Sequence, residues 1–249
     1  MKLTVVIPTY NEAENLPRLA AALFELAVSD LHLLVVDDNS PDGTGQIAED
    51  LAEQFPGRVT VLHRQGKLGL GTAYISGFKQ ALRLGADAVC QMDADFSHPV
   101  EKIPELLKTL ETCDVALGSR YIPGGGLDHN WPVWRKALST FGNVYARMIL
   151  RTPIRDMTGG FRLWRRGALM AMPLERVRSN GYAFQVEMAY IAHKLGFRFT
   201  EVPFYFADRH WGESKMSLCI QREAAVRVWW FLWHYRDLEP VLRPFESLA

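Results

Sequence analysis

The sequence contains little cysteine and no long hydrophobic run. Its three cysteines, Cys90, Cys113 and Cys219, are widely spaced and form no Cys-x-x-Cys pair. This excludes a disulfide framework and a cysteine-based zinc site, and it favours a reducing compartment. No apolar stretch approaches the roughly 18–20 residues that a membrane-spanning helix requires. No signal peptide is apparent before the first strand-like segment, so we expect a cytoplasmic protein that is not integral to a membrane.

Several common site motifs are also missing. No Gly-x-Gly-x-x-Gly or Walker sequence follows the first predicted strand, which disfavours dinucleotide and ATP sites of those types. The glycine-rich segment 66–72 lacks the Gly-Lys-Ser/Thr ending, so we interpret it as a structural turn whose backbone can line the crevice. There is no His-Glu-x-x-His, and Gly118-Ser119-Arg120 is not a nucleophile elbow, so nucleophilic hydrolysis is unsupported.

Net charge is zero, with 28 basic and 28 acidic residues, and gives no support for nucleic-acid binding. The charges are nevertheless unevenly distributed along the chain. Residues 1–60 contain ten acidic and three basic residues, whereas residues 120–166 contain nine basic residues and two acidic ones, Asp128 and Asp156. An acidic half facing a basic half would suit a metal-bound anion between them, although a solvated basic face is the simpler alternative.

Short apolar runs alternate with helical patterns along the 249 residues, of which 48% are hydrophobic. Strands are predicted over residues 3–7, 31–36, 59–63, 86–92 and 115–118, with a late strand over 197–206. A first helix follows the cap residue Asn11 and a capping box completed by Glu14, and it carries an apolar stripe from Leu16 to Phe24. Further helices are predicted over 44–54, 71–84, 100–110, 133–150, 184–195 and 224–235. This order predicts an α/β fold with a doubly wound, mostly parallel, Rossmann-like sheet.

Polar residues follow three of these strands. Segments 8–12 and 37–44 follow the first and second strands, and Asp93 and Asp95 follow the fourth. The carboxyl ends of parallel strands border the crevice where such sheets bind ligands, and residues i and i+2 of a strand share a face. Paired carboxylates suit Mg²⁺ or Mn²⁺, which also hold substrate phosphates. A lone Asp-x-Asp is more often a solvated loop, but three polar strand ends together predict a metal and anion site.

Seven segments, in order along the chain, carry a resemblance to known enzymes. They are 6–12 (VIPTYNE), 36–44 (VDDNSPDGT), 92–99 (MDADFSHP), 118–121 (GSRY), 156–162 (DMTGGFR), 181–188 (GYAFQVEM) and 208–215 (DRHWGESK). The first four resemble family 2 glycosyltransferases, and the last three narrow the resemblance to the polyprenol-phosphate (dolichol-phosphate) mannosyltransferases. The resemblance implies a GT-A fold, a GDP-mannose donor, a polyprenyl phosphate acceptor and Mg²⁺ or Mn²⁺.

The resemblance also implies roles at the matching positions. The guanosine would be held by Pro8, Tyr10, Glu12, Val36 and Asp38. The diphosphate and metal would be met by Asp93, Ala94 and Asp95, with Asp95 as the direct metal ligand. Donor phosphates would be contacted by Arg120, Arg209 and Lys215, which with Asp95 are the catalytic candidates. The acceptor phosphate would be bound by Arg135. We interpret His98 as a turn residue and assign it no role.

The implied chemistry agrees with these residue types. The departing diphosphate gains charge that a divalent cation and arginines stabilise. The acceptor phosphate is already an anion, so no general base is needed. We therefore expect a single displacement with inversion, giving a β-linked product.

We expect one glycosyltransferase domain over residues 1–215 and a C-terminal aromatic helix over 216–249. Segment 224–235 is apolar nearly all round, which fits either a core helix or an interfacial helix on the membrane that carries the acceptor. This predicts a peripheral protein on the cytoplasmic face of a membrane, bound through its own surface or through a membrane-anchored partner protein.

Two alternatives remain open. The donor could be a UDP-sugar such as UDP-glucose, because Tyr10 and Asp38 do not distinguish guanine from uracil by chemistry alone. The protein could also be a non-catalytic nucleotide-sugar-binding subunit of a membrane complex, although the intact acidic pair argues against a silent site.

Overall fold

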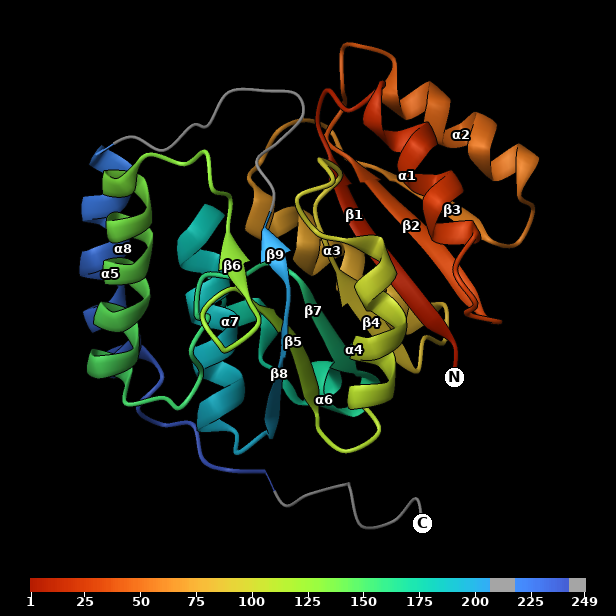
Figure 1. Ribbon diagram of the computed structural model, residues 1–249. Helices are drawn as coiled ribbons and strands as arrows, with labels where there is room; N and C mark the ends of the chain where they lie inside the picture. The colour runs from red at the N-terminus through yellow and green to blue at the C-terminus, as the bar shows by residue number, and fades with distance from the viewer. Residues whose placement is uncertain (207–217, 242–249) are drawn as a thin grey trace.

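A seven-stranded sheet forms the centre of the molecule (Figure 1). The computed structural model describes residues 1–206 and 218–241, and the side chains of all of these except 218–224. In spatial order the strands are β3 (Val59–His63), β2 (Leu31–Asp37), β1 (Leu3–Thr9), β4 (Ala88–Gln91), β7 (Arg162–Arg165), β5 (Val115–Ser119) and β8 (Phe199–Pro203). All neighbouring pairs are parallel except those of β7. The prediction of a mostly parallel α/β sheet is confirmed.

Helices cover both faces of this sheet. One face carries α1 (Asn15–Phe24), α2 (Thr44–Gln54) and α4 (Ile103–Thr109), which follows the 3₁₀ turn Val100–Lys102. The other carries α3 (Leu70–Arg83), α6 (Arg166–Ala171) and α7 (Gly181–Lys194), with the 3₁₀ turn Leu174–Arg176 before α7. Beyond α7 lie α5 (Val133–Leu150) and α8 (Leu218–His234), side by side at the left of Figure 1. A small parallel pair, β6 (Gly126–Leu127) and β9 (Tyr205–Phe206), lies apart from the main sheet.

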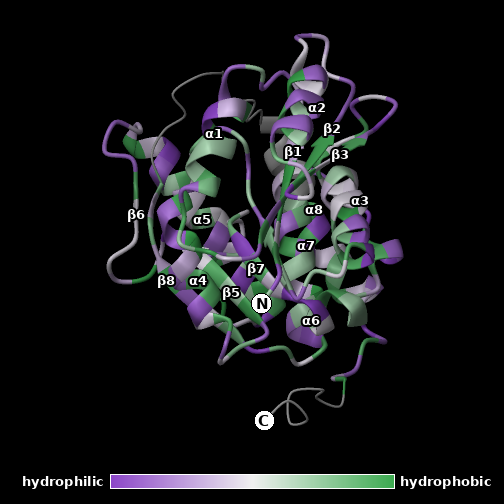
Figure 2. Cartoon of the chain, turned by 90° about the vertical axis from the view of Figure 1, so that its right-hand side faces the viewer, coloured by the Kyte–Doolittle hydropathy of each residue, from purple (hydrophilic) through white to green (hydrophobic). Residues whose placement is uncertain are grey.

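The sheet has a hydrophobic core on each face because its strands are apolar on both. Successive strand residues point to opposite faces, so Val5 and Ile7 pack in the core under α1, whereas Val6 packs in the core under α3. Figure 2 shows the strands as mostly hydrophobic and the outer helices as mixed. A close approach at Gly77 brings α3 onto the sheet, since a Cβ there would lie 2.3 Å from a methyl carbon of Val6.

One central strand escaped prediction from the sequence. β7 runs antiparallel between β4 and β5, and it contains two arginines in four residues. Arg162 is fully buried, and its guanidinium donates to the carbonyl oxygens of Gln185 (2.8 Å) and Met157 (3.0 Å). A buried arginine that donates to backbone carbonyls gives no hydrophobic pattern, so periodicity did not reveal this strand.

The predicted start of the first helix is wrong, although its apolar stripe is correct. α1 begins at Asn15, and Asn11 has a left-handed backbone (φ 63°) instead of capping it. The turn before α1 is held by hydrogen bonds to residues that follow β2. The Asn11 and Glu12 backbone N–H groups donate to the hydroxyls of Ser40 (3.1 Å) and Thr44 (2.9 Å). Contacts from a distant loop therefore replaced the local cap.

The C-terminal helix is buried on one side only. Val228, Phe231 and the adjacent Tyr235 are buried, whereas Trp229 and Trp233 are 58% and 63% exposed. The Tyr235 hydroxyl donates to the buried Glu187 carboxylate of α7 at 2.7 Å, which ties the end of α8 to the domain. The predicted domain boundary after residue 215 lies outside the described residues. Among the residues that are described, no helix has both the length and the hydropathy of a membrane span.

Candidate active site

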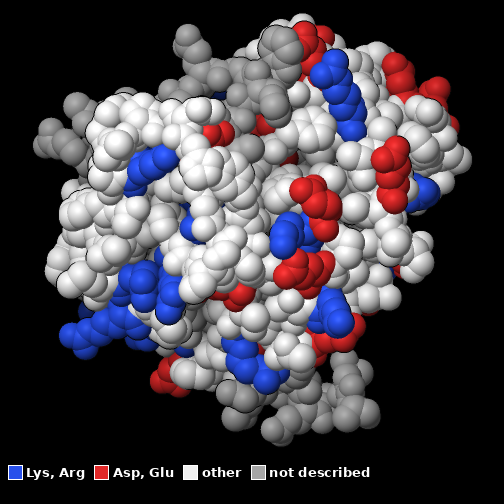
Figure 3. Space-filling model, viewed as in Figure 1, with Lys and Arg blue, Asp and Glu red and all other residues white. Residues whose placement is uncertain are grey.

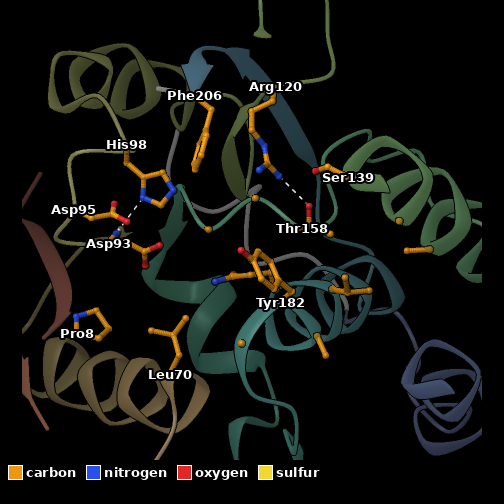
Figure 4. A pocket seen from close by; sticks show the side chains of 18 of the residues that line it. Pro8, Leu70, Asp93, Asp95, His98, Arg120, Ser139, Thr158, Tyr182 and Phe206 are labelled. Carbon is orange, nitrogen blue, oxygen red and sulfur yellow. Dashed lines mark hydrogen bonds between the residues drawn. The ribbon is translucent and has the colours of Figure 1, made fainter. Parts of the chain in front are cut away.

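A cavity of about 840 Å³ lies at the carboxyl ends of the strands. One end is formed by residues after β1 and β2, and the middle by the acidic turn after β4 and by Arg120 after β5. The other end is apolar and runs between α5, α7 and α8. Figure 4 shows the side chains of Asp93 and Asp95 pointing into it from one side and Arg120 from another. The polar strand ends therefore do converge on one crevice, as the sequence predicted.

The two acids of the turn are held in fixed orientations. Asp93 Oδ1 accepts a hydrogen bond from the Tyr74 hydroxyl (2.7 Å). Asp95 Oδ1 accepts from both the hydroxyl (2.6 Å) and the backbone N–H (3.1 Å) of Ser97. Because β4 ends at Gln91, the acids lie on a turn beyond it. They converge through these contacts and not, as we argued from the sequence, through strand alternation.

Tyr74 is a member of the site that sequence reasoning missed. Its side chain is fully buried on α3, where the apolar pattern gave no reason to separate it from the core. Burial, followed by the neighbouring Asp93 charge, raises the pKa of Tyr74 well above its ordinary value. Its hydroxyl therefore stays protonated and keeps donating to Asp93.

These acids are candidate ligands for a divalent cation, but they do not form a complete site. Among the described residues, no group of three or more His, Cys, Asp or Glu side chains converges as a metal site would. Two hard carboxylates fit Mg²⁺ or Mn²⁺, which commonly bind through one or two carboxylates plus substrate phosphates. The residues present thus fit a cation that is shared with a bound diphosphate.

The end of the cavity near β1 and β2 contains a buried ion pair. Arg64 Nη1 lies 2.6 Å from Asp38 Oδ1, and the side chains are only 9% and 8% exposed. Burial raises the pKa of Asp38, although Arg64 opposes this. The Lys67 ammonium lies over the Tyr10 ring at 4.0 Å. The glycine-rich segment thus contributes a cation to the cavity, which its interpretation as a structural turn did not include.

Of the five residues predicted to hold the guanosine, four line this end of the cavity and one does not. Pro8, Tyr10, Glu12 and Asp38 all line the cavity. Val36 does not, since its side chain is fully buried in the core under α3. A nucleoside contact through the Val36 side chain has no support in this arrangement, and its assigned role stays a prediction.

Arg120 is held by a buried partner from a distant segment. Its Nε and Nη2 donate to the two Asp156 carboxylate oxygens, each at 2.7 Å, and its backbone N–H donates to Oδ2 at 3.0 Å. Burial alone would raise the pKa of Asp156, but the Arg120 charge and hydrogen bonds hold it below its ordinary value. Nη2 also donates to Thr158 (2.9 Å). Nη1 has no hydrogen bond with the described residues and can serve a ligand in the cavity.

The other predicted cations are placed as follows. Arg135 lines the cavity near the start of α5, and its guanidinium lies over the Trp131 ring at 3.7 Å. Arg209 and Lys215 lie outside the described residues, so their roles stay predictions. Figure 3 shows basic side chains on the α5 side of the molecule, whereas most of the visible acidic ones lie toward α1, α2 and α4. Not all of the basic segment serves the cavity, because Arg165 and Arg166 donate to backbone carbonyls of Cys113 and of Leu82 and Ala86.

His98 is part of the site and is not merely a turn residue, which corrects our interpretation of the sequence. It is 3% exposed, lines the cavity and stacks on Phe161, with ring centroids 5.2 Å apart. Its Nδ1 accepts the backbone N–H of Asp93 (3.0 Å; Figure 4). Burial lowers the pKa of His98 despite the nearby acids. The only signal in the sequence was its position three residues after Asp95.

The far end of the cavity is lined by apolar side chains of three helices. From α5 come Leu138, Phe141, Tyr145 and Ala146, from α7 Val186, and from α8 Ala225, Val228 and Phe231. α8 thus uses its buried side to close this arm, and the Tyr145 hydroxyl donates to the Ala225 carbonyl (3.1 Å) across the junction. The cavity therefore joins a charged region to a hydrophobic one.

Comparison with known proteins identifies what the chain is similar to. Residues 4–172 match the family model "Glycosyl transferase family 2". An undecaprenyl-phosphate mannosyltransferase of Micrococcus luteus is 46% identical over 92% of this chain and 93% of its own. A polyprenol monophosphomannose synthase of Mycolicibacterium smegmatis is 46% identical over 90% of this chain and 84% of its own.

Solved structures share the fold at low sequence identity. A mannosyltransferase from Pyrobaculum calidifontis, in complex with GDP-Man and Mn²⁺, is 20% identical with a TM-score of 0.63. The match covers 98% of this chain but only 66% of that one, slightly less than two thirds. Mannosyl-3-phosphoglycerate synthase from Rubrobacter xylanophilus is 19% identical with a TM-score of 0.66, over 95% of this chain and 75% of that chain. Both are GT-A glycosyltransferases in fold.

Proposed function

The chain belongs to glycosyl transferase family 2, and from that premise we propose that it transfers mannose from GDP-mannose to a polyprenyl phosphate, giving a β-linked product. Both curated relatives are named as mannosyl-transferring enzymes with a polyprenol-type acceptor, and each match covers at least 90% of this chain. The observation that carries the proposal is the cavity itself, which is acidic and polar at one end and apolar at the other.

The polar end fits the donor. Asp93 and Asp95 would hold a Mg²⁺ or Mn²⁺ together with the donor diphosphate, and the cation would supply positive charge to offset the charge that develops on the leaving GDP. Arg120 offers Nη1 to a phosphate oxygen while Asp156 fixes the plane of its guanidinium. Pro8, Tyr10 and Asp38 bound the remaining space, where the nucleoside lies.

The apolar end fits the lipid acceptor. A polyprenyl chain has a charged phosphate at one end and hydrocarbon beyond it, which matches the change of lining along the cavity. Arg135 lines the cavity at the start of α5, and in this proposal it binds the acceptor phosphate. Hydrocarbon between α5, α7 and α8 would gain roughly 25 cal/mol per Å² of apolar surface removed from water.

The reaction on this arrangement is a single displacement. The acceptor phosphate oxygen attacks the sugar carbon that carries the diphosphate, from the side opposite to the leaving group, and the configuration inverts. No side chain has to remove a proton, because the acceptor phosphate is already ionised. This agrees with the neutral, buried state of His98, which is tied to the Asp93 backbone.

One assay with purified protein, Mn²⁺ and undecaprenyl phosphate tests both the identity of the donor and the stereochemistry of transfer. We expect GDP-mannose to be consumed with release of GDP, and NMR of the product to show a β-linked mannosyl phosphate. UDP-glucose under the same conditions should give at least about a hundredfold lower rate, since a site that hydrogen-bonds one base leaves polar groups unpaired with another. If the protein uses UDP-glucose and not GDP-mannose, the donor assignment is wrong. If the product is α-linked, the inverting mechanism is wrong.

We also propose that α5 and α8 rest on the membrane that carries the acceptor. Their outer sides carry exposed apolar side chains at helical spacing, which in this proposal form one membrane-facing surface: Trp134, Val144 and Met148 on α5, and Val226, Trp229 and Trp233 on α8. The same helices line the apolar arm, and Phe141 of α5 both lines the arm and is 64% exposed, so the arm lies next to this surface. This face suits direct peripheral binding at the cytoplasmic leaflet, without requiring a membrane-anchored partner.

Vesicle flotation checks this surface. Replacing Trp134, Met148 and Trp233 together with glutamine is expected to lower partitioning onto vesicles with anionic lipid by at least about tenfold, because each buried apolar side chain contributes about 1.5–3 kcal/mol. Met170→Gln is the matched control, since Met170 is 62% exposed on α6, away from this face. Equal flotation of the triple variant and the wild type would contradict the proposal.

A further inference from the structure

The turn that carries the two acids is closed at its far end by His98. The chain reverses at Phe96, which has a left-handed backbone (φ 60°). Ser97 then binds the carboxylate of Asp95, and the His98 ring returns to accept the backbone N–H of Asp93 at 3.0 Å. Each acid is therefore fixed by one of the two residues that follow the reversal.

The hydrogen bond defines the state of the imidazole. An N–H group donates to Nδ1, so Nδ1 carries no hydrogen and the neutral ring carries it on Nε2. The ring plane is also fixed, because it stacks on Phe161 at an interplanar angle of 9° and meets Phe204 and Phe206 edge-on. A rigid ring with one defined acceptor atom faces the Asp93 backbone.

The Asp93 backbone in turn determines where its carboxylate points. That carboxylate accepts a hydrogen bond from the Tyr74 hydroxyl at 2.7 Å. Without the His98 acceptor, the Asp93 N–H would lose its partner, and the turn could relax by moving both acids. A displacement of about 1 Å at such a site is enough to weaken it substantially.

We propose that His98 is a positioning residue that holds the Asp93–Ala94–Asp95 turn in the geometry required to share a divalent cation with the donor diphosphate. The proposal deepens the proposed function and rests on its metal and diphosphate site, but it does not depend on which base or sugar the donor carries. The hydrogen bond that Nδ1 accepts from the Asp93 backbone fixes the turn, and the packing of the ring contributes less.

Two substitutions separate the acceptor from the packing. Phenylalanine keeps an aromatic ring against Phe161 but has no acceptor. Asparagine loses the ring, but its amide oxygen stands the same number of bonds from the backbone as Nδ1. Glutamine serves as a length control, because its amide lies one bond further out, near the position of Nε2. If the ring only packs, His98→Phe should bind the metal and nucleotide most like the wild type. If Nδ1 positions the turn, His98→Asn should do so.

The test is calorimetric titration of GDP in Mn²⁺ and in EDTA, with thermal melting of each variant to verify folding. The dissociation constant in EDTA divided by that in Mn²⁺ measures how much the metal strengthens GDP binding. We expect His98→Phe and His98→Gln to lower this ratio about 10- to 100-fold, as loss of a residue that orients metal ligands does, and His98→Asn to stay within about threefold of the wild type. GDP binding in EDTA should change little in any of them.

The outcomes separate the two proposals. A wild-type ratio retained in His98→Phe, or lost equally in His98→Asn, would overturn the role of His98. If wild-type protein binds UDP and not GDP, the donor assignment fails, and the same comparison made with UDP still decides on His98. Absence of any metal-dependent nucleotide binding by the wild type would overturn both.

Discussion

Replacing Asp95 with asparagine is expected to lower kcat for mannosyl transfer by about a thousandfold, about 4 kcal/mol in the barrier. The carboxylate points into the cavity and is the proposed direct ligand of the cation, so a neutral amide there weakens the stabilisation of the departing diphosphate. The fold should persist, because the amide oxygen can still accept the hydrogen bonds that Ser97 gives to Oδ1. Steady-state transfer over a range of Mn²⁺ concentrations measures the effect.

A matched control is available on the surface. Asp50→Asn removes the same charge from α2, where Asp50 accepts a hydrogen bond from Gln46 and does not line the cavity. It should leave kcat within about twofold and the melting temperature nearly unchanged, as surface substitutions usually do. If Asp95→Asn turns over at the control rate in saturating Mn²⁺, Asp95 is not the metal ligand.

The second large effect is expected on stability. Asp156→Ala should reduce the free energy of unfolding by about 3–5 kcal/mol, because it leaves the Arg120 guanidinium buried without its counter-charge. The side chains of Arg120 and Asp156 are only 7% and 0% exposed, so the unbalanced charge would lie in a largely buried environment. For a chain of this size each kcal/mol corresponds to about 2–4 °C in Tm. Urea unfolding followed by circular dichroism provides the measurement.

A double variant separates the buried charge from the rest of the site. Arg120→Met combined with Asp156→Leu removes both charges, so it should recover part of the stability lost in Asp156→Ala, yet remain inactive. Acid gives a second check. Because the pKa of Asp156 is lowered by folding, its contribution is present above its ordinary pKa of 3.8 and is lost as pH falls below that value. If Asp156→Ala unfolds with the wild-type free energy, the pair is not a major source of stability.

The fold was predictable where local sequence reflects burial. β3, α2 and α5 begin and end at the predicted residues, since each is bounded by turn residues and has a clear pattern. The late segment 197–206 instead divides into β8 and β9, two strands in different sheets. β7 was missed because it contains the buried Arg162, whose guanidinium donates to the carbonyl oxygens of Gln185 and Met157, an arrangement that leaves no periodic hydrophobic pattern in the sequence.

The candidate site was predictable to the same extent. The polar strand ends and the acidic pair were located from the chain, because parallel strands bring their carboxyl ends to one edge. Arg120 was located only through the family resemblance of segment 118–121. The partners that hold them in place were not. Tyr74 lies 19 residues from Asp93, and Asp156 lies 36 residues from Arg120, so neither pairing could be inferred without the packing of helix on sheet.

The sequence by itself determined the architecture, the family resemblance and the position of Asp93 and Asp95 at a strand end. It did so because hydrophobic periodicity, turn chemistry and short motifs are local properties of the chain. Only the tertiary structure decided that His98 accepts from the Asp93 backbone, that Asp156 neutralises Arg120, and that α5 and α8 form both an apolar arm and an exposed apolar face. These depend on which distant segments pack together, and packing is settled by the whole core at once.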